Sequence, residues 1–182
     1  MEFVEGDELH SKANVEKISS GRPLNDQDRE PWLKLIRETM ERRTVHRPVC
    51  EVKRECHGLL VTCSALKGDY RELLRGRRRS VRDTSGTSPP EKYPGAQKQA
   101  ESIATYFVYI KGRKELILQR LQERKGHYMK SNMLDSQFED LESPEGEGDV
   151  VVVDAEDDTQ SQMDGAKEKI MAIAGDWFLK CF

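Results

Sequence analysis

The unbroken valine run Val150–Val153 indicates the fold class of this chain more directly than any other segment. Consecutive β-branched residues favour a β-strand, and a strand without polar alternation is typical of one buried on both faces. Leu59–Cys63, also expected to be buried on both faces, and Tyr106–Ile110 are further apolar runs of strand length, and Phe3–Val4 reads as the end of another. Strands of this kind predict a parallel sheet.

Helical patterns separate these strands. Ser11 is suited to cap a short helix that Gly21 ends. A longer helix accepts Pro31 in its first turn and has its apolar residues at helical spacing, namely Trp32, Leu33, Ile36 and Met40. The helices expected are 12–20, the longer one capped at Asn25, Asp26 or Asp28, then 67–75, 113–124, 132–141 and 163–178. The alternation predicts an α/β doubly wound domain, a parallel sheet with helices on both faces.

Length and composition limit what this domain can be. A chain of 182 residues suits one compact domain, and its net charge of −3 gives no general reason to expect nucleic acid or an anionic membrane. No apolar run approaches the ~20 residues of a membrane span, and no secretory signal is visible. We therefore expect a cytoplasmic protein with reduced cysteines. Cys50 and Cys56–His57 lack the spacing of a zinc knuckle.

Composition divides the chain into three parts. Residues 76–105 are basic and rich in Pro, Gly and Ser without any period, which predicts a disordered insert between an N-terminal part, 1–75, and a C-terminal part, 106–182. The basic run Arg75–Arg82 holds five arginines where the insert begins. Such a run is usually solvated. Nucleic-acid binding is the alternative, but no aromatic residues are interleaved.

Five sequence blocks follow one another between Gly6 and Glu142. They are GDELH from Gly6 with Asn14 and Lys17 downstream, GRPLNDQDREPWL from Gly21, CSALKGDYR from Cys63, RLQERKGHY from Arg120, and SQFEDLE from Ser136. In the same order, they resemble GDxLHxxxNxxKM, GxPLNDxDRxPWL, CSALKxxYR, RLxxRxGHF and SQFExLE of the gluconate kinases, a family of small P-loop kinases. The departures include Ser11 in place of Pro and Ile18 in place of Met.

This resemblance implies a P-loop kinase-like fold and an enzyme, ATP:D-gluconate 6-phosphotransferase, that uses ATP and Mg²⁺ and supplies 6-phosphogluconate to the pentose phosphate route. Its partners would be D-gluconate and ATP, with a homodimer left open and neither nucleic acid nor a membrane expected. The family's phosphate-binding loop, GxxxxGK[ST], occurs nowhere in the 182 residues. We therefore expect a sheet that lacks the first, central strand with its loop, and strands that do not form one continuous sheet.

The resemblance also implies roles for single residues. Asp7, just beyond the carboxyl end of a strand, would accept the proton of the gluconate 6-hydroxyl or help to hold magnesium. His10 and Arg29 would bind the hydroxyls and the carboxylate of the sugar acid, because Arg offers a carboxylate a bidentate fork. Lys67 and Arg71 lie four residues apart, which places two cations on one helical face for an anionic substrate. An ordinary surface role is the alternative for each.

Arg120 and Arg124 have the same spacing and resemble the lid arginines that clamp nucleotide phosphates. Two rival hypotheses stand beside the leading one. Another small P-loop kinase, such as one acting on shikimate, fits the GRPLNDQDREPWL and CSALKGDYR blocks less well. A non-catalytic chain is the other: a truncated gene model, splice form or degenerate paralogue that binds gluconate or pairs with an intact subunit. Whichever of these hypotheses holds, we expect the 182 residues alone to lack kinase activity and to fold poorly.

Overall fold

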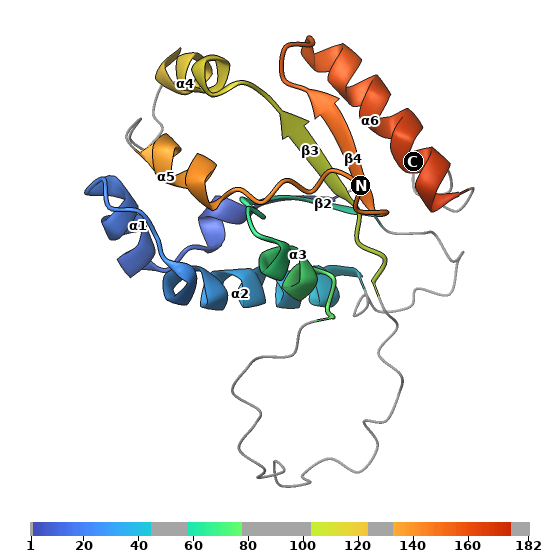
Figure 1. Cartoon of the computed structure of the whole chain (residues 1–182). Helices are drawn as coiled ribbons and strands as arrows, with labels where there is room; N and C mark the ends of the chain where they lie inside the picture. The colour runs from blue at the N-terminus through green and yellow to red at the C-terminus, as the bar shows by residue number, and fades with distance from the viewer. Residues whose placement is uncertain (1, 45–57, 78–102, 124–132, 176–182) are drawn as a thin grey trace, which may run out of the picture.

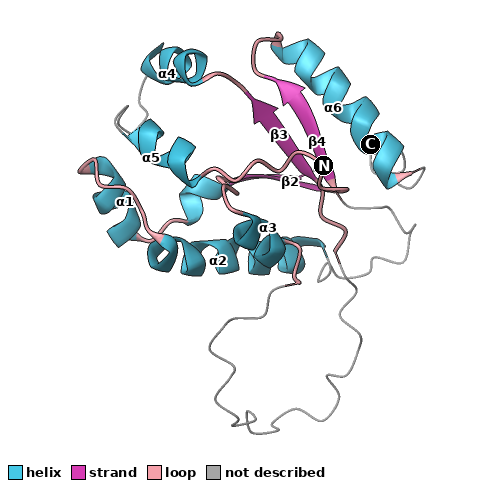
Figure 2. Cartoon of the chain, viewed as in Figure 1, coloured by secondary structure: helices cyan, strands magenta, loops and turns pink. Residues whose placement is uncertain are grey.

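The structure is a computed structural model that describes residues 2–44, 58–77, 103–123 and 133–175. Strands and helices alternate in it as the sequence predicts (Figure 1, Figure 2). The elements are β1 (Glu2–Glu5), the 3-10 helix η1 (Gly6–Leu9), α1 (Lys12–Ser19), α2 (Asp26–Thr44), β2 (Leu59–Thr62), α3 (Gly68–Leu74), β3 (Phe107–Lys111), α4 (Lys114–Glu123), α5 (Met133–Asp140), β4 (Val150–Asp154) and α6 (Thr159–Ala174). Within these ranges, no helix is long and apolar enough to cross a membrane.

The four strands of the described ranges form two separate parallel pairs. β1 pairs with β2, with Val4 opposite Val61, and β3 pairs with β4, with Tyr109 opposite Val152. Figure 1 shows α6 running alongside β4, on the side away from α4 and α5. The architecture is therefore α/β with parallel strands, as the sequence predicts. The described strands do not join into one continuous sheet, which the sequence also predicts.

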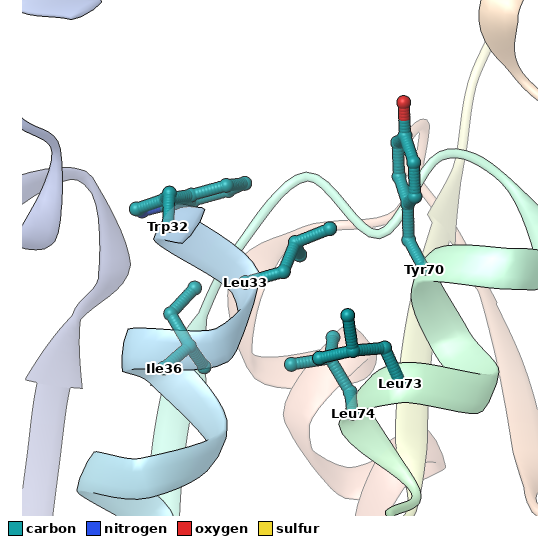
Figure 3. Packing of buried hydrophobic residues seen from close by; sticks show 6 residues of the cluster. All are labelled: Trp32, Leu33, Ile36, Tyr70, Leu73 and Leu74. Carbon is teal, nitrogen blue, oxygen red and sulfur yellow. The ribbon is translucent and has the colours of Figure 1, made fainter. Parts of the chain in front are cut away.

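The largest hydrophobic core lies between α2 and α3 (Figure 3). Residues at helical spacing form one apolar face on each helix, and these faces meet. Three side chains come from α2 and three from α3: Trp32, Leu33, Ile36, Tyr70, Leu73 and Leu74. Phe107 of β3 packs against the edge of this cluster, so the core also contacts the second strand pair. A smaller cluster joins Ile18, Leu24 and Met133.

β2 is more exposed than predicted. Val61 and the following Cys63 pack against the core, but Leu60 is 50% exposed. The prediction that Leu59–Cys63 is buried on both faces is wrong, because the helices cover the face of β2 that carries Val61 and leave the other face exposed. In the described structure, β2 also pairs with a neighbour only on its β1 edge.

The start of α2 differs from the prediction in one respect. Asn25 and Asp28 cap the helix reciprocally, since the Asp28 N–H donates to Asn25 Oδ1 and the Asn25 N–H donates to Asp28 Oδ2, each at 2.9 Å. The helix therefore begins at Asp26, and Pro31 lies inside it, beyond the first turn. The predicted first-turn position of Pro31 is wrong because this cap starts the helix earlier.

α6 also begins earlier than predicted. The Asp158 carboxylate accepts hydrogen bonds from the Gln160 and Ser161 N–H groups, so the helix starts at Thr159 rather than Met163. The helix ends at Ala174, and Gly175, which caps it, adopts φ 73°. In a strongly acidic stretch, this single N-cap aspartate is hard to recognise from the sequence.

Two arginines of the α3 segment tie it to the loop before β4. Arg71 donates to Glu147 Oε1 from Nε and Nη2 at 2.9 and 2.7 Å, and Arg75 donates from Nε to Asp149 Oδ2 at 2.6 Å. The side chains of Arg71 and Arg75 are 3% and 6% exposed. We call these four residues the α3–loop ion cluster. The prediction that Arg75 belongs to a loose, solvated run is wrong, because these acids lie against it.

The residues after Arg75 close α3. Gly76 adopts φ 77°, its N–H donates to Leu73 O, and the Arg77 N–H donates to Glu72 O, each at 3.0 Å. This is the Schellman arrangement, which favours glycine at the left-handed position. The first two residues of the expected insert thus terminate a helix, whereas 78–102 lie outside the described residues.

Candidate functional site

Asp7 lies in a tight turn at the carboxyl end of β1. The turn requires Gly6, because a Cβ there would come within 2.0 Å of the Thr62 carbonyl oxygen. Trp32 Nε1 donates to Gly6 O at 2.8 Å in the interior, and the Gly6 N–H donates to Thr62 Oγ1 at 3.2 Å. Since both sides of the turn are fixed, the partly exposed Asp7 carboxylate has a defined place beside the sheet.

His10 stacks on the ring of Trp32. The ring centroids are 4.2 Å apart and the planes differ by 17°. Burial lowers the pKa of His10, the Asp7 charge opposes that shift, and the Arg29 charge adds to it. The imidazole is therefore neutral at pH 7, and Asn14 Nδ2 lies 3.4 Å from its Nδ1. Because Nδ1 faces the Asn14 amide donor, Nε2 is the nitrogen left to donate to a sugar hydroxyl.

The two downstream residues of the first block join α1 to α2. Asn14 Nδ2 donates to the Asp28 carbonyl oxygen at 2.9 Å, and Lys17 forms an ion pair with the Asp28 carboxylate. The Lys17 hydrogen bond lowers the pKa of Asp28. Asn14 and Lys17 thus hold the helix that follows His10 against the start of α2.

Arg29 and Lys67 come together in a mixed cluster of charges. Arg29 Nη1 lies 2.8 Å from Asp140 Oδ2, and Lys67 Nζ lies 3.4 Å from Asp140 Oδ1. Lys67 also pairs with Asp26 Oδ1 at 2.7 Å, and the Tyr70 hydroxyl donates to the same oxygen. Helices α2 and α5 and the residue before α3 therefore supply one network of two cations and two carboxylates, which the Tyr70 hydroxyl of α3 joins.

Protonation in this network follows from its contacts. Hydrogen bonds from Lys67 and Tyr70 lower the pKa of Asp26, and the hydrogen bond to Asp26 raises the pKa of Lys67. Burial, and then the bond to Asp26, raises the pKa of Tyr70. The acid is consequently ionised, the lysine charged and the phenol neutral at pH 7.

Arg71 does not join these two cations. Its side chain is buried in the α3–loop ion cluster and also donates to Ala65 O and Leu66 O at 2.9 and 3.1 Å. Arg120 lies on the exposed surface of α4, and Arg124 lies outside the described residues. The structure thus brings His10 to the Trp32 face beside Asp7, places Arg29 with Lys67, and leaves Arg71 and Arg120 apart.

Cys63 follows β2 near Asp7. Burial and, to a smaller degree, the Asp7 charge together raise the pKa of the Cys63 thiol to about 12. The thiol is therefore protonated and unreactive at pH 7. Cys50, Cys56, His57 and Cys181 lie outside the described residues.

Three residues of the network carry no site role in the sequence-based prediction: Asp26, which was expected only as a possible helix cap, Tyr70 and Asp140. Asp26 and Tyr70 stand inside the blocks that begin at Gly21 and Cys63, so these sequence blocks could have identified both as site residues. Asp140 occupies the variable position of the last block and is 111 residues from Arg29. Only the fold reveals that contact.

Comparison with known proteins places the chain among sugar kinases of α/β architecture. No family model matches it. Among solved structures, a gluconokinase from Sinorhizobium meliloti 1021 superposes with a TM-score of 0.69 at 30% identity, covering 100% of this chain and 83% of that one. A sugar kinase from Janibacter sp. HTCC2649 gives 0.68 at 29% identity, covering 96% and 81%.

Sequence relatives define the family more closely. The thermoresistant gluconokinase of Escherichia coli is 38% identical over 84% of this chain and 69% of its own length. A probable gluconokinase of Xenopus tropicalis is 35% identical over 94% and 82%. For a probable gluconokinase of Saccharomyces cerevisiae, at 37% identity, the matched part spans 80% of this chain and 60% of the relative. The chain belongs to the gluconokinase family.

Proposed function

We propose that this chain serves the ATP-dependent phosphorylation of D-gluconate to 6-phospho-D-gluconate. Family membership supports the reaction. The observation that carries the assignment to a site is the pairing of Arg29 and Lys67 around one carboxylate, next to the turn that holds Asp7 and His10. The reaction would take place in the cytoplasm, where ATP is available.

The two cations suit the acid end of the sugar. Arg29 is buried, and its guanidinium projects toward a carboxylate, the group for which its planar fork is best matched. Lys67 contributes a second positive charge beside it. A carboxylate bound there would gain charge-assisted hydrogen bonds that a neutral sugar cannot form. Arg71 would act on this site by holding the α3 segment in place.

Asp7 would supply base catalysis. As the 6-hydroxyl oxygen bonds to the γ-phosphorus of ATP, its proton passes to the Asp7 carboxylate and ADP leaves. His10 would orient the hydroxyl chain, because its stacking on Trp32 fixes the imidazole plane. Catalysis of this kind depends mainly on positioning and charge stabilisation.

Phosphate binding would draw on further groups. Within the described part of the chain, no three His, Cys, Asp or Glu side chains are arranged to hold a metal. Mg²⁺ usually takes one or two carboxylates with phosphate and water oxygens, so a single carboxylate such as Asp7 is enough for this mode of Mg²⁺ binding. When bound, Mg²⁺ would neutralise phosphate charge. Arg120 and Arg124 would contact the nucleotide phosphates, and the GxxxxGK[ST] loop absent from the 182 residues would have to be supplied by other residues.

A coupled assay tests the reaction in a version that carries such a phosphate-binding loop. This version should phosphorylate gluconate with ATP and Mg²⁺. Asp7→Asn should lower kcat by roughly 10²-fold, the usual scale for loss of a general base, and leave KM for gluconate similar. Glu8→Gln, an exposed acid in the same turn, is the matched control. A near-normal kcat for Asp7→Asn would exclude the base role.

A second candidate function is gluconate binding without catalysis. The two separate strand pairs of the described residues favour it. Calorimetry separates the two: a chain that binds gluconate but neither binds ATP nor turns over would be a binding module.

A further inference from the structure

Asp140 lies where a ligand carboxylate would have to bind. Its two oxygens contact different cations, Oδ2 at 2.8 Å from Arg29 Nη1 and Oδ1 at 3.4 Å from Lys67 Nζ. The Arg29 side chain is 6% exposed and Asp140 is 31% exposed, so Asp140 covers the cation from the solvent side. Access to Arg29 therefore requires that Asp140 moves.

The position of Asp140 conflicts with a local rule. It is the final residue of α5, whose last turn contains no basic residue. A negative charge at a helix C-terminus is unfavourable, because that end carries partial negative charge. Breaches of local preference concentrate at functional sites, where long-range contacts compensate for them. Among the described residues, the compensation comes from the ion pairs of Asp140 with Arg29 and Lys67.

Lys67 keeps a second partner if Asp140 leaves, since Asp26 Oδ1 lies 2.7 Å from its Nζ. Arg29 pairs with Asp140, and its Cζ also lies 5.9 Å from the centroid of the Tyr70 ring. A neutral ligand that displaced Asp140 would leave the buried guanidinium without this carboxylate, whereas a carboxylate ligand would replace one carboxylate by another. The exchange is therefore selective for acids.

We infer that Asp140 is an internal stand-in for the substrate carboxylate, displaced when the sugar acid binds, and hence a specificity-determining residue of the site. This inference rests on the proposed function. Met133 at the other end of α5 is buried with Ile18 and Leu24, so that end remains anchored. Displacement frees the C-terminal turn of α5 from Arg29 and Lys67 while the rest of the helix stays docked.

The test is a calorimetric titration of gluconate at fixed ionic strength into the 182-residue chain and three variants. Asp140→Asn removes the competing charge and should tighten gluconate binding by about three- to tenfold, the scale of one partly exposed ion pair. Glu139→Gln makes the same charge change on an exposed neighbour and should leave Kd within twofold. Asp140→Glu restores the carboxylate and should return Kd toward the wild-type value.

Amide hydrogen exchange distinguishes displacement of Asp140 from a purely structural role, because a structural role predicts no change in exchange when gluconate binds. Gluconate should speed amide exchange at residues 138–140 in the wild type, whereas in Asp140→Asn exchange should be fast before ligand is added. Weaker or unchanged gluconate binding by Asp140→Asn, with a normal melt, would overturn the inference alone. If the wild-type chain melts cooperatively but binds no gluconate, the assignment of this site to the sugar acid fails and this inference fails with it, whereas the kinase reaction is judged separately by the coupled assay.

Discussion

The α2–α3 region and the region of α4, β4 and α6 differ in how deeply their helices bury apolar residues. Six large side chains of α2 and α3 form one cluster, and Leu33 in it is fully buried. In α6 only Ala174 is buried, while Met163 and Ile173 are 61% and 42% exposed. In α4, no residue is buried. The cations assigned to the sugar acid thus stand on the rigid region, and Arg120, assigned to the nucleotide, stands on the weakly packed one.

This difference in packing shows which binding groups the fold holds in place before a ligand binds. A binding group is held precisely when packing and hydrogen bonds lock its support. Arg29, Lys67 and His10 have such support, from the α2–α3 core, Asp26 and Trp32 respectively. The structure therefore favours a preformed site for the sugar acid and a nucleotide side that depends on further contacts.

Core truncation should separate the two regions most strongly. Leu33→Ala should lower the free energy of unfolding by about 3–4 kcal/mol, because it leaves a cavity in a closed cluster. Ile173→Ala, at a half-exposed position of α6, should cost less than about 1 kcal/mol. Urea denaturation followed by circular dichroism measures both. Equal losses would remove the contrast between the regions.

The α3–loop ion cluster is the link between the regions. Arg75→Ala should destabilise the fold by about 2–3 kcal/mol, since Glu147 and Asp149 would lose a buried partner but remain partly exposed to water. Arg77→Ala removes an arginine of the same basic run that is 65% exposed, and should cost under about 0.5 kcal/mol. If both variants melt alike, Arg75 does not join the regions.

The pH dependence of His10 should be a smaller effect. Burial lowers its folded pKa below 6.5, so the unfolded chain binds more protons between the two values. Stability should therefore rise with pH through that window and be fully present above 6.5. In His10→Gln, this rise should be smaller than in the wild type. Parallel stability–pH curves for the two proteins would contradict the buried, neutral imidazole.

Local pattern was enough to predict which elements form, although local caps start α2 and α6 earlier than predicted. It failed more seriously where distant residues decide. The apolar face of Trp32, Leu33 and Ile36 follows from spacing alone, as does the strand at Val150–Val153. Arg75 looked like part of a solvated run because its partner Asp149 is 74 residues away. The sequence blocks marked Arg29, Lys67 and Asp7 as site residues. They could not show that Arg71 turns inward to Glu147.

A gluconate titration of the wild type against Arg29→Lys shows most directly whether Arg29 binds the carboxylate of gluconate. Lysine keeps the charge but loses the planar fork and its reach. We expect saturable one-to-one binding by the wild type, weakened about tenfold or more in Arg29→Lys while the melting temperature stays similar. Equal affinity in two well-folded proteins would contradict the placement of the sugar acid at this site.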